Sequence, residues 1–244
     1  MPARLATVVV LALALATAGA IPAEAARPSA SAATLTAEPT VAADASEGVD
    51  TKAPWFCHNL DCPRFTVLES TDDYELREYE AASWVSTDVS AYAYALAART
   101  GFQRLYQYID GANKEAVKVP MTAPVVTRIG AAAGPFCKNN FTIAFFVPFA
   151  FQSKGAPQPN NPDVYLSYTP ALKVYVAQTG GFVVDDYSIS RMANRLTDAL
   201  DDAGLAYASG EFFFAGYDPP FRLAARHNEV AVLAGEAADS QPAQ

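Results

Sequence analysis

GFQRLYQYIDGANKEAVKVPMTAPV, residues 101–125, is the stretch that decides the fold, because it joins an amphipathic helix to a strand through a specific turn. Apolar side chains at helical spacing predict a helix over 89–110. Its expected core-facing stripe consists of Ala91, Tyr94, Ala98, Leu105 and Ile109. Gly111 and Asn113 follow it and predict its end, because both residue types tolerate positive φ.

The strand that follows the turn is predicted over 119–128 and contains Pro120 and Pro124. Proline cannot donate a ladder hydrogen bond, so this strand is expected at a sheet edge or with bulges. Alternating side chains predict further strands over 65–69, 74–79, 83–87, 141–147, 164–169, 173–179, 211–217 and 228–233. A second helix is predicted over 189–203, with Gly204 as its stop. Its apolar face is formed by Ile189, Met192, Leu196 and Leu200.

The order of strands, one helix and strands occurs twice along the chain. This order predicts an α+β fold in which two related halves close their antiparallel sheets on each other. Two helices are expected to pack outside, with no βαβ crossover units.

The N-terminus has the composition of an export signal. Arg4 precedes an apolar run over 5–20, and Ala23-Glu24-Ala25 predicts cleavage after Ala25. We expect secretion or delivery to an endomembrane lumen, with a plastid location as the alternative. No other long apolar segment follows, so no stable membrane insertion is expected after signal removal.

Composition and charge divide the rest of the chain. Residues 26–53 are rich in Ala, Ser, Thr and Pro and predict a disordered linker, followed by one domain over 54–235 and a flexible tail over 236–244. Removing residues 1–25 takes away one Arg and one Glu, so the formal net charge remains -9. This sign argues against nucleic acid or an anionic membrane surface as the main partner.

Three cysteines remain after signal removal: Cys57, Cys62 and Cys137. An oxidising compartment favours pairing two of them, but the sequence does not say which two. A zinc site at Cys57 and Cys62 would need a further pair of ligands, and the sequence shows no pattern that indicates one. Asn140 begins an Asn-Phe-Thr sequon and is a glycosylation candidate if the host is an exporting eukaryote.

The opening stretch resembles the signature of the SOUL/heme-binding protein family. A second block, YDPP at 217–220 followed by RHNEV at 226–230, resembles the closing motif of that family. The resemblance covers roughly residues 62–233 and is that of an exported member of plant or algal type. It implies a distorted antiparallel barrel of pseudo-twofold symmetry that binds heme or a related tetrapyrrole as a monomeric, non-enzymatic carrier or buffer.

The resemblance also implies a shallow apolar site between the first helix and the YDPP loop. Matching residues there are Arg99, Phe102, Tyr106, Tyr217 and Arg222. Phe102 and Tyr106 replace methionines of the heme-binding branch, and Gln107 stands where that branch has a lysine. His227 is the candidate axial ligand, although a histidine-free binding mode is the alternative. From the residues alone, this helix face also fits an ordinary solvated surface.

The sequence supports an enzymatic function less than it supports a binding function. The acid pairs at 72–73, 185–186 and 201–202 are adjacent in sequence and are expected to face water. The chain contains no Gly-rich phosphate loop, HExxH helix or nucleophile elbow. Two alternatives to a tetrapyrrole carrier remain. One is a gyrase-inhibitor-like hydrolase that uses Glu78 or Glu211 with Tyr217, and the other is a protein-interaction module that uses the Pro-rich loop over 148–162.

Two motif asparagines and a motif glutamate are expected to serve the fold. Asn113, Asn228 and Glu229 stand at turns or strand starts, where their side chains can satisfy backbone groups. Met121 and Thr122 are expected to pack and to pin an irregular strand.

Overall fold

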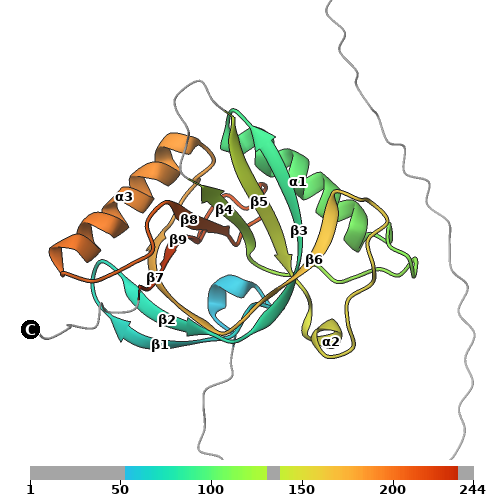
Figure 1. The fold of residues 1–244 in the computed structure, drawn as a ribbon, viewed down its shortest axis with the longest axis horizontal. Coiled ribbons are helices and arrows are strands. Elements are labelled where there is room, and N and C mark those ends of the chain that lie inside the picture. The colour runs from blue at the N-terminus through green and yellow to red at the C-terminus, as the bar shows by residue number, and fades with distance from the viewer. Residues whose placement is uncertain (1–52, 131–137, 236–244) are drawn as a thin grey trace, which may run out of the picture. The chain divides into compact units, whose positions relative to one another are not determined.

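A computed structural model describes residues 53–130 and 138–235, all within one compact unit, Val49–Gln244 (Figure 1). Its strands are β1 (Phe65–Ser70), β2 (Glu75–Tyr79), β3 (Ala82–Ala91), β4 (Val125–Gly130), β5 (Asn139–Phe146), β6 (Val164–Thr169), β7 (Leu172–Thr179), β8 (Glu211–Gly216) and β9 (Asn228–Leu233). Its helices are η1 (Trp55–Cys57), α1 (Tyr94–Ile109), α2 (Phe149–Gln152) and α3 (Asp186–Asp202). The strands form one sheet in the order β1-β2-β7-β9-β8-β4-β5-β3-β6.

The strand order contains an internal twofold relation. Exchanging β2 with β6, β3 with β7, β4 with β8 and β5 with β9 leaves the order from β2 to β6 unchanged when it is read from the other end. Every named pairing is antiparallel, and the same exchange places α1 on α3. The predicted α+β fold with two pseudo-twofold-related halves is therefore confirmed, with β1 as an added strand beside β2.

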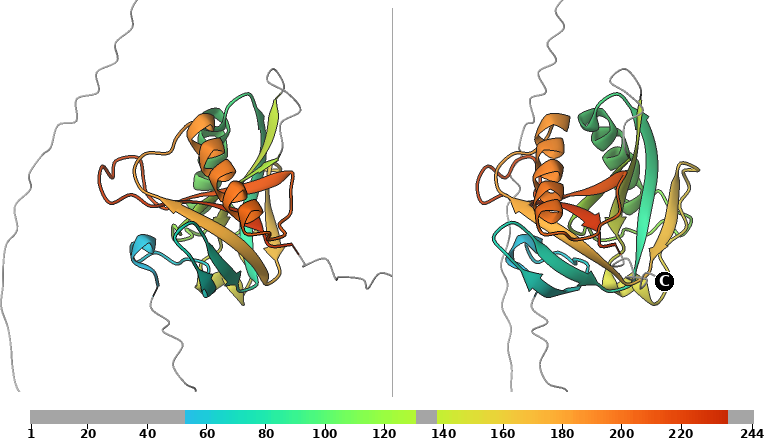
Figure 2. Two further views of the ribbon diagram at one scale, coloured as in Figure 1. Left: turned by 90° about the vertical axis from the view of Figure 1, so that its left-hand side faces the viewer. Right: turned by 60° about the vertical axis from the view of Figure 1, so that its left-hand side comes forward.

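The two long helices cover one face of the curled sheet. Helix α1 packs on β3 and β5, and α3 packs on β7 and β9 (Figures 1 and 2). Their buried side chains, with those of the strands beneath, form the main hydrophobic core, as Leu105, Ile143 and Leu196 illustrate. Because both helices lie on the outer face, the inner face of the sheet is left to form a hollow.

Close packing explains one helical glycine in the opening stretch. Gly101 faces β5, and a Cβ added there would lie 2.7 Å from Cγ1 of Ile143. Gly101 therefore lets the backbone of α1 approach the sheet. The predicted core stripe of this helix is partly wrong, because Ala97, Gly101 and Tyr108 are buried while Ala98 is only half-buried.

Two predicted boundaries differ from the structure. Helix α1 begins at Tyr94 rather than at residue 89, because β3 continues to Ala91 and pairs with β5 from Trp84 to that residue. The strand predicted over 119–128, at a sheet edge or with bulges, is also wrong in its start and in its place in the sheet. Pro120 and Pro124 precede β4, which starts at Val125 and lies inside the sheet between β8 and β5.

Other local predictions are confirmed. Strands β1 and β2 form the expected hairpin, and α3 ends before Gly204, whose φ is +66°. The Asp185 carboxylate accepts a hydrogen bond from the Ser188 amide at 2.9 Å and caps α3. Asn113 satisfies the Val117 amide and two carbonyls, as its place in the turn predicts.

None of the helices in the described ranges combines the length and hydropathy that a membrane crossing requires. Residues 1–25, 26–52 and 236–244, for which we predict a signal peptide, most of a linker and a tail, lie outside the described residues.

Candidate functional site

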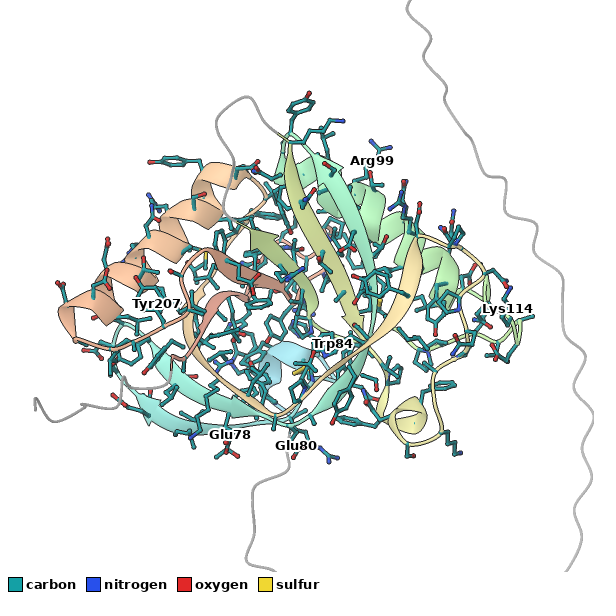
Figure 3. The ribbon with its side chains drawn as sticks, viewed as in Figure 1. Glu78, Glu80, Trp84, Arg99, Lys114 and Tyr207 are labelled. Carbon is teal, nitrogen blue, oxygen red and sulfur yellow. A yellow bond between two sulfur atoms is a disulfide. The ribbon has the colours of Figure 1, made fainter. Side chains whose placement is uncertain are left out.

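The inner face of the sheet lines a cavity of about 240 Å³. Successive side chains of a strand point to opposite faces, so β5 turns Ile143 toward the helices and Ala144 toward this cavity. Most of the lining is apolar and comes from both halves of the fold. Trp84 contributes from β3 (Figure 3), and Val176 and Phe213 contribute from β7 and β8.

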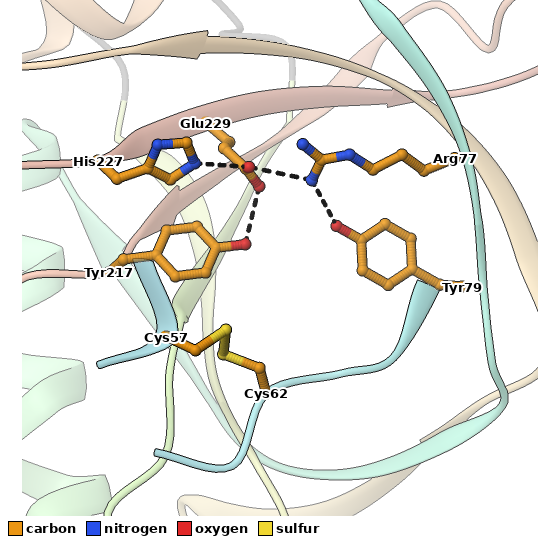
Figure 4. The surroundings of a disulfide bond; sticks show 7 residues. All are labelled: Cys57, Cys62, Arg77, Tyr79, Tyr217, His227 and Glu229. Carbon is orange, nitrogen blue, oxygen red and sulfur yellow. Dashed lines mark hydrogen bonds and ion pairs between the residues drawn. A yellow bond between two sulfur atoms is a disulfide. The ribbon is translucent and has the colours of Figure 1, made fainter. Parts of the chain in front are cut away.

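A buried polar cluster forms one end of the cavity, and Glu229 is its centre. The Tyr217 hydroxyl donates to Glu229 Oε2 at 2.8 Å, while Oε1 lies 2.7 Å from Nε2 of His227 and 3.0 Å from an Arg77 nitrogen (Figure 4). Arg77 also donates to the Tyr79 hydroxyl at 3.1 Å and to Glu75 at 2.7 Å. Each ionic group in the cluster is therefore paired.

The protonation states follow from burial and pairing. Burial alone would raise the pKa of Glu229, but hydrogen bonding to His227 and the charge of Arg77 hold it below its ordinary value of 4.5. Burial and the Glu229 charge raise the pKa of Tyr217 well above 10.0, and they raise that of Tyr79 to about 12. The cluster thus contains a carboxylate, a guanidinium and two neutral phenols near neutral pH.

The segment from Pro54 to Cys62 packs over this cluster. Phe56 stacks on the His227 ring with a centroid distance of 4.0 Å and an interplanar angle of 4°. Cys57 and Cys62 form a disulfide, which decides the pairing that the sequence leaves open (Figure 4). Cys137 lies outside the described residues.

Asp218 of the YDPP motif fixes the neighbouring loop through a fully buried side chain. Its carboxylate lies 2.8 Å from Nε2 of His58 and 3.0 Å from Nε of Arg222, and it accepts the His227 amide proton at 2.6 Å. The two C-terminal motif blocks therefore meet in space and hold each other.

Three of the predicted site residues share the outer face of α1. Phe102 and Tyr106 are 39% and 51% exposed, and their rings stack with centroids 5.9 Å apart. Arg99 lies one turn earlier and points away from the sheet (Figure 3). Gln107 beside them is also exposed.

The other predicted site residues lie elsewhere. Tyr217 and His227 are buried in the Glu229 cluster, and Nε2 of His227 is occupied by that carboxylate. Arg222 is partly exposed in the loop after the YDPP motif, where Phe221 and Leu223 are 81% and 80% exposed. The ligand-binding roles of these residues stay predictions.

The two acids proposed for a hydrolytic site do not reach the cavity. Glu78 is exposed on the outside of β2 (Figure 3), and Glu211 forms a surface ion pair with Arg128 at 3.2 Å. Strand alternation explains the error for Glu78, because its neighbours Arg77 and Tyr79 take the inward positions. Glu229, for which we predicted a role in the fold, lines the cavity together with the exposed Glu80.

Two further sequence candidates have defined positions. Asn140 is exposed on β5, and its glycosylation stays a prediction. The Pro-rich loop over 148–162 contains α2 and is held to the body of the domain. Gln152 donates to the Ser83 carbonyl at 3.1 Å, and Asp61 accepts from the Phe149 amide at 2.9 Å.

Sequence reasoning missed the cavity, although the strands carry a signal for it. In β8 and β9, apolar residues occupy both faces, as the neighbours Phe213 and Phe214 and the neighbours Ala231 and Val232 show. A strand that is apolar on both faces is covered on both sides. Helices cover only the outer face here, so the apolar inner face indicates a lined hollow.

The fold and the site define a class of protein: a pseudo-twofold antiparallel half-barrel with an apolar cavity on its inner face. A solved structure of similar fold is the EcmrR C-terminal domain, with a TM-score of 0.51 and 13% identity over 67% of this chain and 98% of that one. Within this class, the chain belongs to the SOUL heme-binding protein family, whose model matches residues 60–233.

Curated relatives agree with this membership. Heme-binding protein 2 of Mus musculus is 32% identical over 178 residues, covering 71% of this chain and 86% of the relative. The Homo sapiens protein of the same name is 33% identical over 66% of this chain and 77% of the relative. Heme-binding protein 1 of Xenopus laevis is 28% identical over 64% of this chain and 81% of the relative.

Proposed function

We propose that this protein binds heme or a related tetrapyrrole on the outer face of α1, as a non-enzymatic carrier or buffer. The observation that carries the proposal is the exposed, stacked pair of Phe102 and Tyr106 with Arg99 one turn away. Stacked aromatic rings offer an apolar surface to a flat macrocycle, and a guanidinium can pair with a propionate. Membership of the SOUL family and the names of the relatives support the choice of ligand.

The size of the inner cavity also favours the outer face. Pockets that enclose drug-sized ligands usually measure about 300–1,000 Å³. A tetrapyrrole macrocycle is larger than such ligands, whereas this cavity measures about 240 Å³. An exposed site covers only part of the ligand, so we expect at most micromolar affinity.

Titrating the full chain with hemin and following the Soret band tests this proposal. The double substitution Phe102→Ala and Tyr106→Ala is expected to weaken binding at least tenfold, and Arg99→Gln is expected to weaken it less. Tyr187→Ala is the matched control, since Tyr187 is a 75% exposed aromatic residue on the other long helix. The proposal fails if a large excess of hemin causes no spectral change, or if the α1 variants bind as the unaltered chain does.

Axial ligation is tested separately. The two histidines of the chain, His58 and His227, are each bonded to a carboxylate. We therefore expect the Soret maximum of the hemin complex to be unchanged when both are replaced by Ala. A shifted maximum in a variant that remains folded would assign the iron ligand to one of them.

The carrier role is supported by the chemistry of the buried cluster. A general base must be free to take a proton, but three donors hold Glu229 in its ionised form. We expect no turnover of ester or lactone probes by the full chain. Measurable hydrolysis that Glu229→Gln abolishes would favour the hydrolase alternative.

A further inference from the structure

The inner cavity lies apart from the proposed tetrapyrrole surface on α1. We propose that it takes a small, neutral, largely apolar molecule that carries one hydrogen-bond acceptor, such as an aromatic or alicyclic ketone. The cavity and the outer face of α1 lie on opposite sides of the sheet, because β5 places Ala144 in the cavity and Phe145 against Phe102. One ligand therefore cannot occupy both sites.

The walls select an apolar ligand. Both halves of the fold supply aliphatic and aromatic side chains, among them Trp84, Val174, Val176, Phe213 and Leu233. Covering these side chains removes apolar surface from water, which stabilises the bound state by about 25 cal/mol per Å². The volume of about 240 Å³ fits a molecule below the usual drug size.

The charges around the cavity select a neutral ligand. The charged lining residues are Glu229, Arg128 and the exposed Glu80. Glu229 is paired with Arg77, and Arg128 is paired with Glu211. Pairing leaves neither of these two groups as a free counterion, and Glu80 is exposed to water, so a charged ligand in the apolar cavity would lose its hydration and gain at most a solvent-screened contact.

The polar end of the cavity supplies a hydrogen-bond donor. The Tyr79 hydroxyl oxygen accepts from Arg77 and contacts the Tyr217 hydroxyl, and its own proton can be turned toward a ligand oxygen. Its raised pKa of about 12 keeps this group a neutral phenol at physiological pH. Tyr217 is less available, because its proton is donated to Glu229. A ketone fills the whole cavity when its carbonyl oxygen points at Tyr79 and its apolar body lies against Trp84 and Phe213.

Three probes of one shape test this specificity: 2-acetylnaphthalene, 2-ethylnaphthalene and 2-naphthoate. The readout is the indole N–H signal of Trp84 in NMR spectra of the full chain, which Trp55→Phe identifies because the chain has 2 tryptophans. We expect the ketone to shift this signal saturably. The hydrocarbon should bind roughly five- to tenfold more weakly, since it lacks one net hydrogen bond. The carboxylate should cause no shift.

Matched variants separate the two ends of the site. Tyr79→Phe should remove the advantage of the ketone and leave the affinity for 2-ethylnaphthalene unchanged. Ala231→Phe on β9 should abolish binding of both by filling the cavity, and Ala144→Leu does the same from the opposite wall if the first variant does not fold. The Phe102→Ala and Tyr106→Ala variant should bind the ketone normally, and hemin should not displace it.

Three results would overturn the inference. These are the absence of a Trp84 shift at the solubility limit of the ketone, binding of 2-naphthoate as tight as that of the ketone, and displacement of the ketone by stoichiometric hemin. None of these results depends on whether hemin binds at α1, so this proposal and the tetrapyrrole proposal can fail separately.

Discussion

Glu229 shows how residues far apart in the sequence specify one small region. It is 3% exposed, and its partners come from β2 and from both C-terminal motif blocks. Asp218 likewise joins residues far apart in the sequence, because its carboxylate contacts both His58 and Arg222 beside the loop between those blocks. The motif residues Tyr217, Asp218, His227 and Glu229 thus stabilise the fold around the cavity through contacts with one another.

Glu229→Gln tests the energetic role of the buried carboxylate. The amide keeps the shape of the side chain but removes the charge that compensates Arg77. Breaking a buried ion pair from one side usually costs about 3 kcal/mol, and we expect a loss of that size in the free energy of unfolding by urea. Glu211→Gln, which breaks the surface pair with Arg128, should cost no more than about 1 kcal/mol. Equal losses of unfolding free energy in the two variants would contradict a stabilising role for the buried Glu229 carboxylate.

The lowered pKa of Glu229 predicts a pH dependence of stability. In the folded chain this carboxyl titrates below its ordinary value of 4.5, so the unfolded chain binds a proton first as the pH falls. The contribution of the Glu229 carboxylate to the free energy of unfolding is therefore complete above about pH 4.5. It is lost as the pH falls through the pKa of this group in the folded chain. Urea unfolding from pH 7 to 3 should show a smaller acid loss for Glu229→Gln. An identical acid profile would refute the prediction.

At the scale of elements, the contact between α1 and β5 fixes how closely a helix can approach the sheet. Gly101→Ala adds a Cβ where less than 3 Å is available to three atoms of Ile143. Although alanine favours a helix, the clash should lower the free energy of unfolding by about 1–3 kcal/mol. Gly130→Ala is the control, because no atom lies within 4 Å of the added Cβ. A stabilised Gly101→Ala variant would show that α1 can move outward at no cost.

The disulfide anchors the segment that covers the buried cluster. Replacing Cys57 and Cys62 by Ser opens a loop with a sequence separation of 5, for which the loop-entropy relation gives about 2 kcal/mol. We expect thermal unfolding at a lower temperature for the double variant. Alkylation of the unaltered chain before reduction should leave both cysteines unlabelled. Labelling of either one would show that the pair is not closed in solution.

Local periodicity predicted most elements but not the boundaries that tertiary pairing decides. Residues 89–93 continue the helical pattern of α1, yet Val89 and Ala91 pair with Phe141 and Asn139 across β3 and β5. The prolines of the opening stretch indicated an edge strand, whereas they end an irregular segment before an interior strand. In both cases the partner strand that sets the boundary lies more than 15 residues away in the sequence. A local sequence pattern therefore does not reveal it.

At the scale of the whole molecule, the symmetric strand order places β4 and β8 at the centre of the sheet and β1 and β6 at its edges. Amide hydrogen exchange should follow this order, because central amides open only with the larger part of the sheet. We expect the slowest exchange in β4, β5, β8 and β9, and the fastest strand amides in β1 and β6. Rapid exchange in β4 would mean that the two halves separate easily.

The candidate sites differ in how far the sequence could reveal them. Arg99, Phe102 and Tyr106 share a face because helical spacing alone requires it, so that surface was predictable. The cavity needs residues from β2, β3, β7, β8 and β9 at once, and no local pattern specifies the closing curvature. Tyr217 was expected at the tetrapyrrole surface but lies in the Glu229 cluster, because the end of β8 turns it inward.

The packing of Phe56 on His227 also bears on where the folding unit starts. The family model begins at residue 60, after Phe56 and one half of the disulfide. A fragment cut at that residue would leave the His227 ring, Tyr217 and the Glu229 carboxylate open to water. We therefore expect the smallest autonomously folding domain to begin before residue 60, where the family model starts. Proteolytic trimming between Pro54 and Cys62 would act on stability and on access to the cavity together.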